Sequence, residues 1–136
     1  MIAALLAPGV GIAQKGPSDY NGLVAAVKPQ VIEWRRHLHQ YPELSNREVK
    51  TAEYVANHLR KLGLEIRTQV GLTGVVGILK GGKPGPVVAL RADMDALPVK
   101  ERAELPFKSV QEAEYLGQTV PVMHACGHDA HVAILM

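Results

Sequence analysis

Residues 45–79, SNREVKTAEYVANHLRKLGLEIRTQVGLTGVVGIL, change from helical to strand periodicity within a short stretch and decide the fold class. Ser45 to Glu48 forms a capping box, in which the serine side chain accepts a backbone hydrogen bond and the glutamate reaches back to the N-cap. Gly63 occupies the position after the end of the helix that this box begins. The buried face of that helix is predicted from apolar residues at helical spacing, Ala52, Val55, Ala56, Leu59 and Leu62.

Three strands are predicted after this helix. Residues 64–70 alternate between apolar and polar side chains, which indicates a half-exposed strand that ends at Gly71. Residues 75–79 and 87–90 are uninterrupted apolar runs, which indicate strands covered on both faces. The order of two helices and three strands predicts an α/β fold with a mixed sheet flanked by helices.

An earlier helix is predicted upstream of the capping box. Its apolar positions recur at helical spacing at Val24, Val27, Val31, Trp34 and Leu38. Pro29 is expected in its first turn, where a missing N–H costs nothing, and the helix should end near Tyr41, which precedes a proline. We expect His37 and His39 to be solvated near its end, and His58 to lie on the exposed side of the second helix.

The ends and the bulk composition limit the class of protein. Residues 1–14 are apolar and uncharged, which fits either a signal peptide remnant, with a periplasmic or secreted protein, or an irregular start of a cytoplasmic one. Residues 15–22 indicate a linker, so the folded part should span residues 23–136. The net charge of +2 gives no electrostatic case for nucleic acid or a membrane surface, and one cysteine excludes an intrachain disulfide. The apolar stretches are shorter than the roughly 18 residues of a membrane span.

A first candidate site follows the last predicted strand. Residues 91–98 read RADMDALP, and Asp93 and Asp95 point to the same side if the chain is extended. Such a pair can bind a metal ion or orient a histidine ligand. The alternative is a polar loop in which Asp93 pairs with Arg91 and Asp95 caps a turn. Residues 91–123 show no sustained period, which predicts a long loop that is functional or poorly ordered.

A second candidate site, HACGHD, spans residues 124–129. His124, Cys126 and His128 are spaced by two, so an extended segment places all three on one side. Thiolate and imidazole are ligands that zinc, manganese or cobalt ions accept. Asp129 opens a predicted final helix, on which His131 shares the face of His128. Two alternatives are a cysteine nucleophile activated by a histidine, and a buried structural cysteine beside solvated histidines.

Together these motifs resemble a known enzyme family. The chain is similar to the metallopeptidase superfamily of aminoacylases and carboxypeptidases, in the amidohydrolase branch that holds hippurate hydrolase, N-acyl-L-amino-acid amidohydrolase and the indole-acetyl-amino-acid hydrolases of plants. The resemblance covers residues 30–136 and is most specific in the last two of its four motifs. These motifs are WRRHLHQYPELS at 34–45, TGVV at 73–76, RADMDALP at 91–98 and MHACGHD at 123–129.

The resemblance implies a fold, a site and a reaction. The fold is the N-terminal part of a metallopeptidase catalytic domain. Cys126 and His128 are metal ligands, and Asp95 is the acidic catalytic-site residue that supports them, while Asp93 stands where other branches have a histidine ligand. A complete site takes two divalent ions (zinc, manganese or cobalt), and the reaction hydrolyses the amide bond of N-acyl amino acids or small peptides. The complete enzyme can form a homo-oligomer.

Several parts that the family requires are missing from this sequence. They are a downstream Glu-Glu pair that supplies the general base, further histidine ligands and an inserted dimerisation domain. We therefore expect the sequence to be the N-terminal portion of such an enzyme, inactive alone and weak in metal binding, because two or three ligands do not close a site. The rival hypothesis, from another class of protein, is a non-catalytic metal-binding or structural module.

Overall fold

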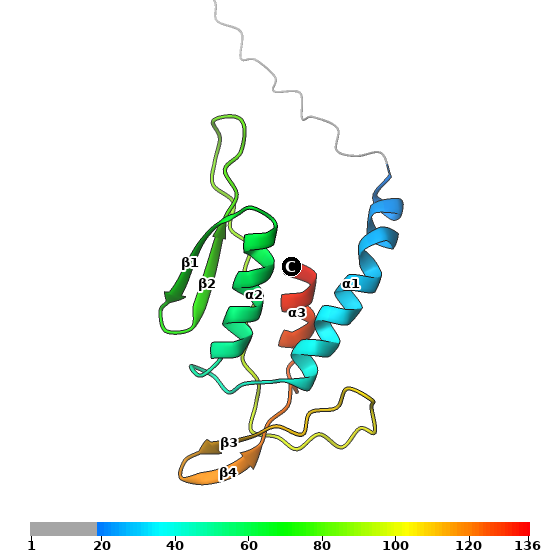
Figure 1. Ribbon diagram of the computed structural model, residues 1–136, viewed down its shortest axis with the longest axis vertical. Coiled ribbons are helices and arrows are strands. Elements are labelled where there is room, and N and C mark those ends of the chain that lie inside the picture. The colour runs from blue at the N-terminus through cyan, green and yellow to red at the C-terminus, as the bar shows by residue number, and fades with distance from the viewer. Residues whose placement is uncertain (1–18) are drawn as a thin grey trace, which may run out of the picture.

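The computed structural model describes residues 19–136, which form three helices and two antiparallel hairpins (Figure 1). Residues 1–14 and the first half of the predicted linker, residues 15–18, lie outside the described residues, so export remains a prediction. No helix in the described chain is long and apolar enough to span a membrane. The α/β class is confirmed, although its strands form two small sheets. The elements are α1 (Tyr20–Gln40), α2 (Val49–Lys61), β1 (Glu65–Val70), β2 (Gly74–Ile78), β3 (Glu112–Tyr115), β4 (Gln118–Pro121) and α3 (His128–Leu135).

The transition from α2 to β1 follows the sequence prediction closely. Gly63 adopts φ 79°, and its N–H donates to the carbonyl of Arg60. The N–H of Leu64 donates to the carbonyl of Leu59, which completes a Schellman motif. A Cβ atom at Gly77 of β2 would lie 3.1 Å from both leucine side chains. The glycine therefore lets the β1–β2 hairpin pack closely against the end of α2.

The start of α2 differs from the predicted capping box. Ser45 is exposed, and the helix begins only at Val49. The orphan backbone N–H groups of the first turn are satisfied instead by Glu43, whose carboxylate accepts from Lys50 N (3.2 Å), Thr51 N (2.8 Å) and Thr51 Oγ1 (2.9 Å). Glu43 reaches this position because its own carbonyl accepts from the N–H of Ala96 (2.8 Å), which fixes the segment before the helix.

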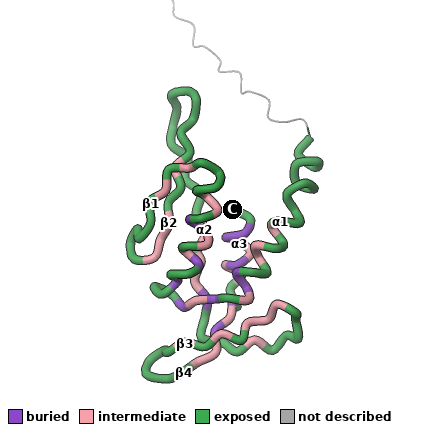
Figure 2. The backbone as a smooth tube through the Cα atoms, viewed as in Figure 1, coloured by how far each residue is buried: buried purple, intermediate pink, exposed green. Residues whose placement is uncertain are grey.

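Helix α1 is longer than the prediction. It begins at Tyr20, so Pro29 lies inside the helix and residues 20–22 belong to the helix and not to a linker. Asp19 caps it by accepting from the N–H of Gly22. The expected apolar face is covered only from Val31 onward, and Figure 2 shows the earlier turns exposed. The predicted end is confirmed, since the helix ends at Gln40.

The main core lies between the helices. In Figure 1, α3 lies between α1 and α2. Leu38 of α1 and Val132 and Ala133 of α3 are buried there, and Trp34 and Val55 pack against them from α1 and α2. The structure thereby places the C-terminal half of α1 beside the first turns of α3. This contact brings residues near 35–39 next to residues near 128–133.

Two predictions about the middle of the chain are wrong. Residues 87–90 form no strand, and Val87 is 96% exposed, because no segment among residues 19–136 runs beside this run to accept its backbone hydrogen bonds. Residues 91–123 are not wholly irregular, since they contain the β3–β4 hairpin. Its two turn residues, Leu116 and Gly117, have φ values of 52° and 77°, as a type I′ turn requires.

Candidate metal centre

Backbone bridges bring the two candidate sites together. The N–H of Leu97 donates to the carbonyl of Met123 (3.0 Å), and the N–H of Met123 donates to the carbonyl of Leu97 (3.1 Å). Beneath this bridge, Leu44, Ala96 and Val122 form a second buried cluster. The RADMDALP and HACGHD motifs therefore lie side by side, although about 30 residues separate them in the sequence.

Asp95 fixes the imidazole of His128. Nδ1 of His128 lies 2.9 Å from the carbonyl oxygen of Asp95 and 3.1 Å from its Oδ1. Both oxygens are acceptors, so Nδ1 carries the hydrogen and donates. The lone pair of the neutral ring is then on Nε2, which is the atom free to bind a metal ion. This geometry is what a histidine ligand with an orienting carboxylate requires.

Asp93 does not act together with Asp95. Its Oδ1 accepts from Nη2 (2.7 Å) and Nε (3.1 Å) of Arg91, and both side chains are largely exposed. This is the surface ion pair that the alternative interpretation of the motif described. Asp93 and Asp95 thus have different roles in the structure, and only Asp95 contacts a candidate ligand.

The predicted common face of His124, Cys126 and His128 is wrong. His124 is buried, with 6% of its surface exposed, whereas Cys126 is exposed. Gly127 adopts φ 83° and α3 begins at His128. The chain is therefore not extended from Cys126 to His128, and the alternation that would place these two side chains on one side is lost. Within residues 19–136, no group of three or more histidine, cysteine or acidic side chains is arranged to bind a metal ion.

His124 is a buried histidine without a hydrogen-bond partner among the described residues. Burial lowers the pKa of His124 to about 4, although the nearby carboxylates of Asp129 and Asp95 oppose this shift. The ring is therefore neutral at pH 7. Two unsatisfied ring nitrogens are costly in a protein interior, so a further polar group that hydrogen-bonds this ring would be stabilising.

His39 is buried and not solvated, which corrects the sequence prediction. It is 5% exposed, and its Nδ1 is hydrogen-bonded with Oδ2 of Asp129 (2.9 Å) and its Nε2 with Oε1 of Glu101 (2.9 Å). Arg35 donates from Nε to the same Oδ2 of Asp129 (3.0 Å). The ring is covered because α3 packs across this end of α1. The i, i+4 spacing of Arg35 and His39, which share one helix face, was the available sequence signal.

The two carboxyl groups of this network remain ionised. Burial raises the pKa of Asp129, but the hydrogen bonds from His39 and from the backbone N–H of Ala130, with the positive charge of Arg35, outweigh burial and lower it. Burial likewise raises the pKa of Glu101, and the hydrogen bonds from His39 and from the N–H of Ser109 lower it below its ordinary value. Both groups therefore attract the donors that face them at neutral pH.

The remaining histidines lie away from the two motifs or at their edge. His58 is not on an exposed face as expected, because its Nε2 lies 2.9 Å from the carbonyl of Met136 and its ring contacts Trp34 edge-on. His37 stacks on Tyr54 at 4.2 Å and stays on the surface, as the sequence predicted. His131 is exposed, with its ring centroid 6.0 Å from that of His128.

The residues present fit part of a metal site. The thiol of Cys126 and Nε2 of His128 have the chemistry that divalent zinc, manganese or cobalt accepts, and Asp95 orients one of them. Catalytic zinc sites use about three protein ligands. The described residues 19–136 contain no arrangement of three or more such donors, so they do not form a complete site by themselves.

Comparison with known proteins finds relatives described as peptidases and amidohydrolases. Residues 89–136 match the model of peptidase family M20/M25/M40. Thermostable carboxypeptidase 1 of Saccharolobus solfataricus is 53% identical over 114 residues, which are 83% of this chain and 27% of that protein. N-acyl-L-amino acid amidohydrolase of Geobacillus stearothermophilus is 47% identical over 118 residues, 87% of this chain and 30% of that protein.

A solved structure extends the similarity to the fold. The crystal structure of a Bacillus subtilis protein, described as a dinuclear metal-binding peptidase of the M20 family, has a TM-score of 0.69 at 43% identity. The match covers 80% of this chain and 28% of that one. The family of these proteins is therefore one of peptidases and amidohydrolases. Residues 89–136 of this chain belong to peptidase family M20/M25/M40, and the chain spans about a quarter of the length of the curated relatives it matches.

Proposed function

We propose that this chain contributes a metal-binding half-site to a hydrolase that cleaves the amide bond of N-acyl amino acids or small peptides. The observation that carries the proposal is the hydrogen bond from Nδ1 of His128 to Asp95, which leaves Nε2 available two residues after Cys126 in the HACGHD motif. Support for the substrate class comes from relatives named N-acyl-L-amino acid amidohydrolase and hippurate hydrolase, the latter from Campylobacter jejuni at 46% identity over 102 residues.

Each residue has a defined task in this proposal. Cys126 and His128 hold the metal, and Asp95 keeps the imidazole in the tautomer that binds it. Cys126 directly precedes Gly127, the residue at which α3 is capped. Divalent ions, when bound, polarise the amide carbonyl and increase the acidity of water.

The 136-residue chain alone is expected to bind metal weakly and to lack turnover, since two donors do not close a site. The rival hypothesis, a non-catalytic metal-binding or structural module, predicts the same behaviour. The two hypotheses make different predictions for the complete protein that carries this sequence. There the hydrolase proposal requires release of the amino acid from hippurate or another N-acyl amino acid, and the rival does not.

Cobalt binding by the 136-residue chain tests the half-site directly. A Co²⁺ titration should give a thiolate-to-cobalt absorption band that disappears in Cys126→Ser. Asp95→Asn should raise the apparent Kd for Co²⁺ by about 10-fold, the lower end of the effect of losing an orienting carboxylate. Asp93→Asn is the matched control and should leave the Kd unchanged, because Asp93 pairs only with Arg91 at the surface. Equal effects of the two substitutions would contradict the assigned role of Asp95.

Metal content and activity of the complete protein distinguish whether Cys126 is a metal ligand or a nucleophile. Cys126→Ala should remove both the bound metal and the hydrolysis of N-acyl amino acids. A variant that keeps stoichiometric metal and loses only its activity would make Cys126 a nucleophile and overturn the assignment. Hydrolysis of hippurate by the 136-residue chain alone would show that the described residues suffice for catalysis, against the proposal.

A further inference from the structure

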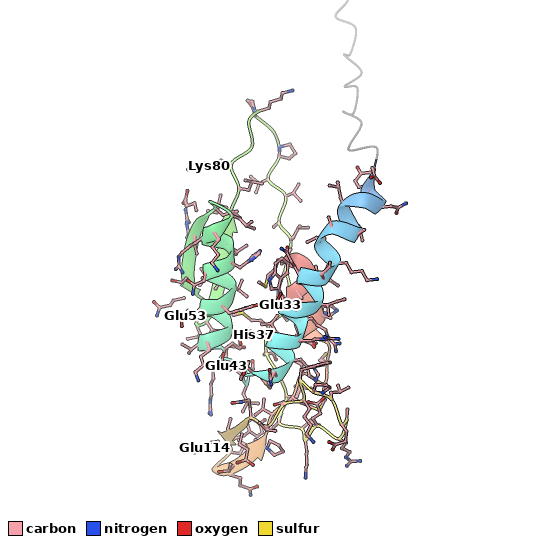
Figure 3. The ribbon with its side chains drawn as sticks, turned by 45° about the vertical axis from the view of Figure 1, so that its right-hand side comes forward. Glu33, His37, Glu43, Glu53, Lys80 and Glu114 are labelled. Carbon is pink, nitrogen blue, oxygen red and sulfur yellow. The ribbon has the colours of Figure 1, made fainter. Side chains whose placement is uncertain are left out.

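Charged side chains from three parts of the chain meet beside the first turn of α3. Arg35 and His39 come from α1, Asp129 from α3, and Glu101 from the segment between β2 and β3. The side chains of His39, Glu101 and Asp129 are 6%, 2% and 1% exposed. Figure 3 shows side chains gathered where the lower end of α1 meets α3. A network this deeply buried requires a specific arrangement of its members.

His39 connects the two carboxyl groups of this network. Nδ1 lies 2.9 Å from Oδ2 of Asp129 and Nε2 lies 2.9 Å from Oε1 of Glu101, so the ring bridges the two carboxyl groups. Removing one partner of such a buried pair leaves an uncompensated charge, which is strongly destabilising. The position of Asp129 is therefore tied to that of His39, and through it to helix α1.

Both arms of His39 lead to the HACGHD motif. Nδ1 of His39 is hydrogen-bonded with Asp129, the residue directly after His128. Nε2 of His39 is hydrogen-bonded with Glu101, whose carboxylate also accepts from the N–H of Ser109 (2.6 Å). The hydroxyl of Ser109 donates to the carbonyl of Val122 (2.6 Å), two residues before His124. The network thus contacts the motif just before its first residue and at its last.

We propose that His39 is a positioning residue for Cys126 and His128, and that it acts through its Nδ1 hydrogen bond to Asp129. Asp129 lies in the first turn of α3, so its hydrogen bonds to α1 fix the place at which this helix begins. The arm from Nε2 to Glu101 holds the segment at 101–109 and has a smaller effect on the two ligands. The inference rests on the proposed function, in which Cys126 and His128 bind metal.

Two substitutions separate the arms of His39. In His39→Asn the side-chain amide can donate from the position of Nδ1, and in His39→Gln it can donate from the position of Nε2. His39→Asn should therefore keep the hydrogen bond to Asp129 and lose that to Glu101, whereas His39→Gln should do the reverse. A role limited to overall stability predicts similar behaviour of both variants.

Cobalt affinity and hydrogen exchange are measured on the 136-residue chain. His39→Gln should raise the apparent Kd for Co²⁺ by about 10- to 100-fold, as losses of supporting contacts around metal ligands do, and His39→Asn should stay close to wild type. The amides of Ala130 and His131, which donate to the carbonyl of Gly127, should exchange faster in His39→Gln alone. The same affinity and the same exchange in both variants would overturn the proposal.

The controls distinguish failure of this inference from failure of the proposed function. Without a Cys126-dependent cobalt band in the wild type, the metal proposal fails, and exchange at Ala130 and His131 still decides the role of His39. Glu48→Gln also changes a buried carboxylate, one that accepts from Thr73 (2.6 Å) in another part of the fold, and should not change Co²⁺ affinity.

A second pair of variants applies if neither His39 variant folds. Arg35→Gln removes the other donor to Asp129, from a side chain that is 43% exposed, and should weaken Co²⁺ binding. Arg36→Gln is its neighbouring control, because Arg36 lies over the ring of Phe107, whereas the ion pair to Asp129 comes from Arg35. Equal Co²⁺ affinity in these two variants would overturn the proposal.

Discussion

Replacing Glu43 with alanine tests which residue caps α2. The Glu43 carboxylate accepts from Lys50 N, Thr51 N and Thr51 Oγ1 at 2.8–3.2 Å. Loss of an N-capping acceptor costs about 1–2 kcal/mol, and part of that comes from its negative charge at the helix N-terminus. We expect Glu43→Ala to destabilise the chain by this amount. Glu43→Gln should recover part of the loss, since it retains an acceptor oxygen.

The measurement is urea and thermal unfolding followed by circular dichroism. About 4 °C of Tm corresponds to each kcal/mol in a domain of this size, so Glu43→Ala should lower Tm by roughly 4–8 °C. Ser45→Ala is the matched control and should change stability by less than about 0.5 kcal/mol, because Ser45 is exposed and lies outside the helix. A capping box makes the opposite prediction. A larger loss in Ser45→Ala than in Glu43→Ala would refute the capping role of Glu43.

Two other substitutions test the site segment. The pKa of Glu101 is lowered in the folded chain, so the stability that its carboxylate contributes is present above the unfolded value of 4.5 and is lost as pH falls through the folded pKa. Glu101→Gln should therefore reduce the loss of stability between pH 7 and pH 3, measured by urea unfolding. The same pH dependence in the variant and the wild type would contradict this. Gly127→Ala should cost roughly 1–2 kcal/mol from its φ of 83° alone, since nothing lies within 4 Å of the added Cβ, while Gly82→Ala should be neutral in the same Tm measurement.

The parts of the fold that the sequence predicted well depend on local signals. Helix α2, the turn at Gly63 and the β1–β2 pair follow from apolar spacing and from glycine at a left-handed position. The final helix at Asp129 likewise follows from an apolar run with an acidic first turn. In each case the interacting residues are a few positions apart, so the pattern itself contains the contact.

The predictions that were wrong depend on partners far away in the sequence. Ser45 matches a capping motif, yet Glu43 does the capping because the bridge to Ala96 holds it there. His39 looks like a solvated helix end, since its partner Asp129 is 90 residues away. Residues 87–90 have the composition of a covered strand, but composition does not reveal whether a neighbouring strand is present. A single sequence gives at most an indirect signal of such long-range contacts, such as the i, i+4 spacing of Arg35 and His39, and does not name the partner residue.

The candidate site shows why adjacent residues of one motif have different roles. Successive residues of a helix point about 100° apart, so His128 and Asp129 at the start of α3 face different neighbours. His128 donates to Asp95, and Asp129 accepts from His39 of α1. Two anchors in different directions fix both the rotation of α3 about its axis and the place where it begins. The Nε2 atom of His128 and the Cys126 thiol therefore take their positions from contacts that neither atom makes, which is why substitutions at Asp95 and His39 are the most direct tests of the site.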